Sequence, residues 1–307
     1  MSVVTTHPLD PNDAAVVAFI RTASRPGKGA LQGIAATRTQ YDALLEGVAP
    51  RDDVTSEAGN LGGIPGVWVR PANAGQDEAI LHLHGGWFNF GSAKAYRNFA
   101  GQIAARAGAR MFVPDYRLAP EHPFPAAVDD ATACYRALGK SGVQRIAITG
   151  DSAGGALALV LAAQAAGDAA LVGVVALSAV TDLTLSGESY MTRADADPFF
   201  TREQVTALVQ SYLGDASPKH PLASPLHGRL AGLPPVRLHV GDDEVLLEDS
   251  RRYVESAVGA GADAKLDVWK GMPHGFQTSV GRIKAAAQSL DEIGAFLAQR
   301  LQAPAGS

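Results

Sequence analysis

The 307-residue sequence contains one cysteine, Cys134, so no internal disulfide can form. It has no run of about 18 apolar residues, which excludes a candidate membrane-spanning helix. The segment MSVVTTHPLD at its start has neither the basic part nor the apolar core of a secretory signal. We therefore expect a cytoplasmic protein in a reducing compartment, with Cys134 acting as a small buried residue of a helix.

Clusters of basic residues are also missing. The chain carries 26 Lys and Arg against 31 Asp and Glu, and no stretch concentrates the positive charge that nucleic acids attract. With 47% hydrophobic and 19% charged residues, the composition is typical of a globular protein. Nucleic acids and membranes are therefore not expected as partners.

Short apolar runs rich in Val and Ile alternate with amphipathic segments along most of the chain. The expected strands are residues 64–69, 79–83, 110–113, 145–149, 172–177, 236–240 and 264–269. The expected helices are residues 10–23, 34–48, 93–107, 125–139, 153–166, 245–260 and 282–301. This alternation predicts an α/β fold, with a mostly parallel sheet covered by helices on both faces.

Two segments depart from the alternation. Residues 1–50 carry two amphipathic helices before the first strand, and residues 183–225 form a long insertion with one well-capped helix, from Thr201 to a stop at Gly214. Insertions beyond the carboxyl ends of parallel strands usually cover a site. We predict that both segments form a helical cap on a catalytic domain made of residues 51–182 and 226–307.

The stretch RIAITGDSAGG, residues 145–155, contains the pattern G-x-S-x-G between an expected strand and an expected helix. In that context the serine lies on a sharp turn with its hydroxyl exposed. Ser152 is therefore the candidate nucleophile. A serine hydroxyl needs a base to accept its proton, and the base needs a group that orients it.

The base should follow the acid in the chain, and the histidines after Ser152 are His220, His227, His239 and His274. The first two fall in the insertion, and His239 lies within an expected strand. His274 follows the last strand on a turn-rich loop, KGMPHGF, so it is the candidate base.

The acid should follow the strand at 236–240. Asp242, Asp243 and Glu244 all lie in suitable positions, and the pattern alone does not choose among them.

The anion that forms on a substrate carbonyl needs hydrogen-bond donors already in place. The amide of Ala153, directly after the nucleophile, is one candidate donor. The stretch HGGW, residues 84–87, follows an expected strand, and its bare backbone at Gly85 and Gly86 predicts two further donors. His82 and His84 have no third metal ligand nearby in the sequence, so neither a metal nor a cofactor is expected.

Five motifs in this order resemble the hormone-sensitive-lipase branch of the α/β hydrolases, the microbial esterases and lipases of that group. They are HGGW at 84–87, DYRLAPEHPFPAAVDD at 115–130, GDSAGG at 150–155, DEVLLEDS at 243–250 and GMPHGF at 271–276. The resemblance implies an α/β-hydrolase fold with an N-terminal cap, a Ser-acid-His triad and short-chain acyl esters as substrates. The resemblance also often implies a homodimer.

Carried over by position, the resemblance makes Ser152 the nucleophile and His274 the base. It makes Gly85, Gly86 and Ala153 the oxyanion donors. The acid is commonly Asp in this branch, but the local pattern resembles the E-x-L-L-x-D-S variant, which places the acid at Glu244, with Asp243 as the alternative.

Trp87 stands where the branch usually has a third glycine. We expect its indole to line the substrate pocket and limit its size; the alternative is that it packs the loop against the cap. Two alternatives to an esterase remain: a lactone hydrolase with the same triad, and a non-catalytic module that binds a small molecule. Plant gibberellin receptors, which are of the second kind, lack the catalytic histidine, whereas His274 is present here.

Overall fold

The computed structural model describes residues 3–29 and 33–302. Its centre is a sheet whose strands are β1 (Val4–His7), β2 (Val54–Leu61), β3 (Ile64–Pro71), β4 (Glu78–Leu83), β5 (Arg110–Pro114), β6 (Arg145–Asp151), β7 (Leu171–Leu177), β8 (Val236–Gly241) and β9 (Ala264–Trp269). Their order across the sheet is β1-β9-β8-β7-β6-β4-β5-β3-β2. The pairs β2–β3 and β3–β5 are antiparallel, and the others are parallel.

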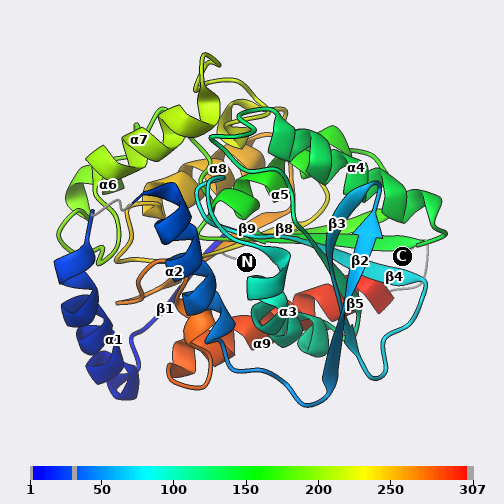
Figure 1. Ribbon diagram of the computed structural model, residues 1–307, viewed down its shortest axis with the longest axis horizontal. Helices are drawn as coiled ribbons and strands as arrows, with labels where there is room; N and C mark the ends of the chain where they lie inside the picture. Colours follow the sequence, from blue (N-terminus) through cyan, green and yellow to red (C-terminus); the bar gives the residue numbers. More distant parts are fainter. Residues whose placement is uncertain (1–2, 30–32, 303–307) are drawn as a thin grey trace.

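Helices cover both faces of the sheet and gather at one end of it. They are α1 (Pro11–Ser24), α2 (Ile34–Glu46), α3 (Ala93–Ala107), α4 (Ala126–Lys140), α5 (Ala153–Gln164), α6 (Ser189–Thr192), α7 (Arg202–Leu213), α8 (Leu247–Gly259) and α9 (Lys284–Gln302). In Figure 1, α4, α5 and α8 lie on one face, and α3 and α9 lie on the other. The predicted fold class, an α/β hydrolase with a mostly parallel sheet, is confirmed.

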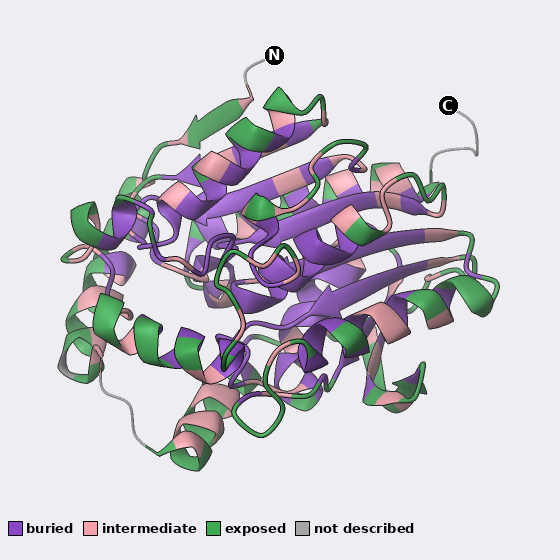
Figure 2. Cartoon of the chain, turned by 90° about the horizontal axis from the view of Figure 1, so that it is seen from above, coloured by how far each residue is buried: buried purple, intermediate pink, exposed green. Residues whose placement is uncertain are grey.

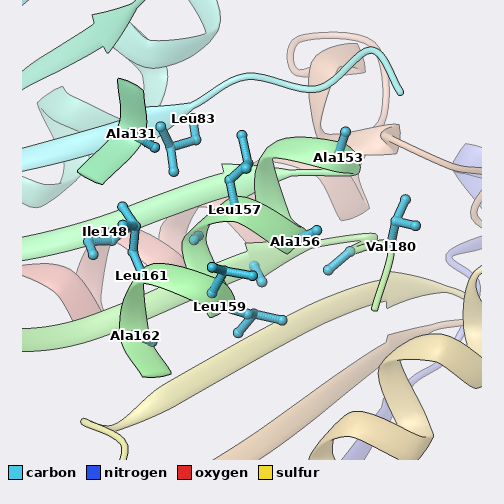
Figure 3. Packing of buried hydrophobic residues seen from close by; sticks show 14 of the residues in the cluster. Leu83, Ala131, Ile148, Ala153, Ala156, Leu157, Leu159, Leu161, Ala162 and Val180 are labelled. Carbon is cyan, nitrogen blue, oxygen red and sulfur yellow. The ribbon is translucent and has the colours of Figure 1, made fainter. Parts of the chain in front are cut away.

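The strands of the sheet centre are buried on both faces, as Figure 2 shows. Helix α5 packs against these strands on one side and against α4 on the other, and its sequence AGGALALVLAAQ is apolar almost all round because both sides are covered. Figure 3 shows its side chains packed beside Leu83, Ile148 and Val180. This packing holds the amino end of α5 in place, and that end carries the nucleophile turn.

Every strand expected from the sequence is present, and every expected helix is present to within a few residues. The sequence reading missed β1 and β2, which lie at the two sheet edges and are largely exposed, so they lack the apolar runs that marked the inner strands. It also missed α6, a single short turn of helix. Cys134 is buried, donates to the carbonyl of Leu61 and has its thiol pKa raised to about 12 by burial, which fits the expected packing role.

The helices of the two predicted cap segments lie at the same end of the molecule. In Figure 1, α1 and α2 lie beside α6 and α7. Lys28, just after α1, donates to the carbonyls of Ala194 and Asp197 in the insertion. Residues 1–2 and 30–32 of the first segment lie outside the described residues. Within the described part of the chain, no helix has the length and apolarity needed to span a membrane.

Candidate active site

The turn between β6 and α5 places Ser152 in a strained backbone conformation, with φ 52° and ψ −118°. Such a conformation costs about 1–3 kcal/mol and persists because its surroundings fix it. The amide of Ser152 donates to the carbonyl of Leu177 at 2.7 Å, and its carbonyl accepts from the amide of Val180 at 3.1 Å. A Cβ at Gly154 would lie 1.9 Å from the carbonyl oxygen of Leu83, so only glycine fits there. The turn therefore has the geometry that the motif predicts.

His274 and Glu244 meet above the neighbouring strand ends. The His274 Nδ1 and Glu244 Oε2 atoms are 2.7 Å apart, and the Glu244 side chain is fully buried. Its other oxygen, Oε1, accepts hydrogen bonds from the amide of Gly241 at 2.7 Å and from the hydroxyl of Ser178 at 2.8 Å. Since a carboxylate only accepts, Nδ1 carries the hydrogen, and Nε2 of the neutral ring is left with a free lone pair.

The three acidic residues after β8 have different partners. Asp243 forms an ion pair with Arg21 of α1, and Asp242 pairs with Lys270 at 2.9 Å. Glu244 alone of the three contacts His274. The expected register, with Glu244 rather than Asp243 facing the base, agrees with this arrangement.

Two buried histidines have opposite pKa shifts. Burial lowers the pKa of His274, but the charge and hydrogen bond of Glu244, together with the charges of Asp197 and Asp151, raise it more, so the net shift is upward. In the described part of the chain, the carboxylate paired with His239 is that of Asp267, whose Oδ2 lies 3.9 Å from Nε2, beyond hydrogen-bond distance. The His239 Nδ1 lies 3.3 Å from Trp269 Nε1 and 3.1 Å from Ser289 Oγ. Burial lowers the pKa of His239 to about 4, so this ring stays neutral. His239 is thus held within the strand, as expected.

The nucleophile turn and the acid are connected through the segment after β7. Val180 binds the carbonyl of Ser152, and two residues earlier Ser178 binds Glu244. Among the described residues, the Ser152 hydroxyl has no hydrogen-bond partner. Contacts between catalytic groups are often long without a substrate and shorten when one binds.

The backbone amide of Gly85 is already occupied. It donates to Asp151 Oδ1 at 3.0 Å and to the hydroxyl oxygen of Tyr96 at 3.0 Å. A Cβ at Gly85 would lie 2.3 Å from Asp151 Oδ2, which explains why the position is glycine. In contrast to the sequence prediction, this amide is therefore not free to bind a substrate oxygen.

The next amides along the same loop are free. Gly86 has φ 113°, a conformation open mainly to glycine, and Trp87 and Phe88 follow with φ 51° and 62°. The amides of Gly86, Trp87, Phe88 and Ala153 have no hydrogen-bond partner within residues 3–29 and 33–302. The sequence prediction of Gly86 and Ala153 as donors is compatible with this geometry, and Trp87 offers a further amide.

The side chains of Trp87 and Phe88 both pack against the insertion. Trp87 is 2% exposed, and its ring meets that of Phe200 edge to face at 5.5 Å. Phe200 in turn lies edge to face against His274 at 5.0 Å. Phe88 stacks on Tyr212 of α7 at 3.8 Å. The insertion therefore contacts both the oxyanion loop, residues 84–90, and the candidate base.

Asn89, near the end of the oxyanion loop, forms hydrogen bonds to residues of both cap segments. Its side chain donates to the carbonyls of Trp87 and Leu208 and accepts from the hydroxyl of Ser211 at 2.8 Å. Its own carbonyl accepts from Arg38 Nε of α2 at 2.8 Å. Asn89 is fully buried, and the two bonds that its side-chain amide donates are buried as well.

The two histidines of the β4 strand end have structural partners. His82 Nδ1 lies 2.9 Å from the Thr149 hydroxyl, and His84 Nδ1 lies 2.9 Å from the carbonyl of Gly85. Among the described residues, one group has a spacing that could hold a metal ion, and it lies on β1, β9 and α9, away from the nucleophile turn: His7, Asp267 and Glu292.

A cavity of about 290 Å³ lies between the two cap segments. It is lined by Arg21, Thr22, Arg25, Lys28, Asp195, Ala196, Asp197 and Pro198. The carboxylate of Asp197 accepts the amide of Val245 at 2.9 Å and contributes to the raised pKa of His274. The cavity therefore borders the segment that carries the candidate acid, although the triad residues do not line it.

The sequence reading did not identify Asp151, Asn89 or Phe200. Asp151 sits in the variable position of the G-x-S-x-G pattern, and its contact with Gly85 joins residues 66 positions apart. An aspartate directly before a nucleophilic serine was the signal available, since a charge beside the reacting group demands a partner.

Comparisons with known proteins agree with this geometry. A family model described as alpha/beta hydrolase fold matches residues 80–278. An acetyl-hydrolase from Streptomyces hygroscopicus is 37% identical over 271 residues, which are 85% of this chain and 88% of that protein. An esterase from Acinetobacter venetianus is 36% identical over 241 residues, 77% of this chain and 79% of that protein.

Solved structures are similar over nearly the whole chain. An esterase from the bacterial hormone-sensitive lipase family has a TM-score of 0.88 at 37% identity, covering 95% of this chain and 99% of that one. The esterase EstE5, soaked with ethyl alcohol, has a TM-score of 0.89 at 34% identity, covering 96% of this chain and all of that one.

Proposed function

Because the chain belongs to the α/β-hydrolase family, in the branch of the bacterial hormone-sensitive-lipase esterases, we propose that it is a serine carboxylesterase that forms an acyl-enzyme at Ser152. The observation that carries the proposal is the buried pair of Glu244 and His274, whose ring is held with Nε2 free. This pair completes a triad with the serine of the strained turn.

In the first half of the reaction, His274 Nε2 accepts the proton of the Ser152 hydroxyl while Oγ attacks the ester carbonyl carbon. The imidazolium that forms is stabilised by the charge of Glu244 at Nδ1. The tetrahedral intermediate then collapses, the bond to the alcohol oxygen breaks, and His274 donates its proton to the leaving alcohol. The acyl group stays on Ser152.

The oxyanion of the tetrahedral intermediate is bound by backbone amides. We assign Ala153, Gly86 and Trp87 as donors, because these amides are free and follow the ends of the adjacent strands β6 and β4. Ala153 is the first residue of α5, so the positive end of that helix favours the same charge. Loss of one such donor typically costs about 10²–10³-fold in kcat.

In the second half of the reaction, a water molecule gives its proton to His274 and attacks the acyl carbon. The ester bond to Ser152 breaks, His274 returns the proton to the serine, and the carboxylic acid leaves. The substrates proposed are short-chain acyl esters, from acetate to hexanoate. The basis is the cap of residues 1–50 and 183–225, whose Phe200 and Tyr212 close over the oxyanion loop and restrict its space.

A panel of p-nitrophenyl esters from acetate to palmitate tests the proposal. We expect the highest kcat/KM between acetate and hexanoate, and no turnover above background with Ser152→Ala. A preference for palmitate, or strong activation by emulsified long-chain triglyceride, would overturn the short-chain assignment.

The same steps open a lactone ring, so lactones belong in the panel. Faster hydrolysis of lactones than of linear esters would make lactone hydrolysis the main activity.

We also predict a homodimer and a cytoplasmic location. Light scattering of the purified chain tests the first, and cell fractionation tests the second.

A further inference from the structure

Asp151 is the last residue of β6, directly before the nucleophile, and its side chain contacts the oxyanion loop. Its Oδ1 accepts the amide of Gly85 at 3.0 Å, and its Oδ2 accepts the hydroxyl of Tyr96 at 2.8 Å. The carboxylate therefore connects the turn that carries Ser152 with the oxyanion loop, and these two segments must face each other around a substrate carbonyl. The catalytic steps given above do not use it.

The hydrogen bonds around Asp151 all run toward its charge. A carboxylate only accepts, so the hydroxyl hydrogen of Tyr96 goes to Asp151. The hydroxyl of Tyr41, 2.7 Å from that of Tyr96, must then donate to Tyr96. Burial raises the pKa of both tyrosines, so both remain donors across the working pH range. Tyr41 belongs to α2, and the chain of bonds thus reaches the cap.

Steric contacts also fix the distance between the Gly85 backbone and the Asp151 carboxylate. The space at Gly85 is so small that an added Cβ would lie 2.3 Å from Asp151 Oδ2 and 2.9 Å from the Tyr96 hydroxyl. The loop backbone is thus in direct contact with the carboxylate. A methyl group added at this contact would therefore displace the loop, the Asp151 carboxylate or both.

We propose that Asp151 is a positioning residue, which holds the Gly85 amide so that the free amides of Gly86 and Trp87 face the substrate oxygen. Tyr96 supports the same contact and links it to α2. The proposal rests on the proposed esterase reaction. Asp151 acts through the loop and does not touch the reacting atoms.

The test compares Asp151→Ala and Asp151→Asn with wild type on p-nitrophenyl butyrate. The alanine variant should lose about 10- to 100-fold in kcat, with KM changed less than about threefold, because loosened donors weaken transition-state binding most. The asparagine variant should recover most of that loss, since its amide oxygen can still accept from Gly85. It should also move the acidic limb of kcat/KM to lower pH, because the charge of Asp151 contributes to the raised pKa of His274.

Asp168 supplies a matched control. Its carboxylate accepts a backbone amide, that of Ala170 at 2.9 Å, and a tyrosine hydroxyl, that of Tyr135 at 2.7 Å, but it lies between α5 and β7. Asp168→Ala should leave kcat within twofold of wild type. A trifluoromethyl ketone, which forms an oxyanion on Ser152, should bind more weakly to Asp151→Ala by the same factor as kcat falls.

Asp151→Asn with its pH profile keeps the proposal testable if Asp151→Ala fails to fold, and Gly85→Ala tests the same contact from the loop side. Its methyl group should push the loop away from Asp151 and lower kcat, and adding Asp151→Ala should lower kcat less than the two separate losses combined, because one residue relieves the clash of the other. The proposal is overturned if Asp151→Ala keeps kcat within twofold, or if Asp151→Asn loses as much as alanine with no shift in pH profile. The esterase proposal itself fails only if wild type hydrolyses no ester, or if Ser152→Ala retains its turnover.

Discussion

Two buried or half-buried carboxylates flank the nucleophile, one on the base side and one on the oxyanion side. Glu244 is fully buried and orients His274, whereas Asp151 is partly exposed and orients the amide of Gly85. The contact made is similar: each carboxylate accepts a hydrogen bond that fixes its neighbour. The difference lies in the neighbour, because a histidine changes charge during the reaction and an amide does not.

Because of this difference, His274 needs a negatively charged partner, whereas the Gly85 amide needs only a hydrogen-bond acceptor in the right place. On the base side, the negative charge must stabilise an imidazolium that exists only for part of the cycle. On the oxyanion side, an acceptor of the right shape is enough. Neutral, isosteric replacement should therefore be severe at Glu244 and mild at Asp151.

Ser152 lies between the two sides, and its loss should have the largest effect. We expect Ser152→Ala to lower kcat by about 10⁴–10⁶-fold, because neither side can act without the nucleophile. The circular dichroism spectrum should match wild type. Retention of more than a few per cent of wild-type kcat would show that the nucleophile lies elsewhere.

Replacing the charge on the base side comes next in size. Glu244→Gln should lower kcat by an amount on the order of 10⁴-fold, since an amide does not stabilise the imidazolium. Asp243→Asn is the control, and it should stay within a few-fold of wild type because Asp243 pairs with Arg21 instead. If Asp243→Asn lowers kcat more than Glu244→Gln, Glu244 is not the residue that orients His274.

The pH profile of kcat/KM tests whether the charge of Glu244 acts on His274. His274 must be neutral to accept a proton, and Glu244 raises its pKa against the effect of burial. The value of kcat/KM should therefore fall about tenfold per pH unit below an apparent pKa that lies above the ordinary 6.5. In Glu244→Gln the residual activity should show this limb at lower pH. A wild-type limb at or below pH 6.5 would contradict the coupling.

The smallest effect is expected on the oxyanion side, at the Trp87 side chain. If the indole limits the pocket, Trp87→Ala should favour bulkier acyl or alcohol groups over acetate, by roughly 0.8 kcal/mol or about fourfold in kcat/KM for each added methylene. The contact of Trp87 with Phe200 is also compatible with loop packing. An equal loss across the ester series, with a lower melting temperature, would identify packing as the role.

Most of the fold could be predicted because buried parallel strands and their covering helices leave strong apolar patterns. The nucleophile turn was visible because its glycines and serine stand between a strand and a helix. The acid could be placed at Glu244 only by resemblance to a local variant, since three acidic residues occupy equivalent positions in the chain. The edge strands β1 and β2 escaped because exposed edges carry few apolar residues.

The oxyanion side was harder to predict for a physical reason. Whether an amide is free depends on what lies opposite it in space, and nothing near Gly85 in the sequence announces Asp151 or Tyr96. The two glycines of HGGW have different causes: Gly85 permits close contact with a carboxylate, and Gly86 permits a positive φ. Sequence alone suggested one shared cause for both.

Mass spectrometry after reaction with diethyl p-nitrophenyl phosphate can detect a covalent intermediate on Ser152. This compound transfers its diethylphosphoryl group to the oxygen of an activated serine and releases p-nitrophenol. Water removes the transferred group only slowly. We expect one diethylphosphoryl group per chain, located on Ser152 by peptide fragmentation, with activity lost in proportion and no labelling of Ser152→Ala. Labelling of another residue, or full ester hydrolysis by a chain that carries the group on Ser152, would contradict a covalent intermediate on Ser152.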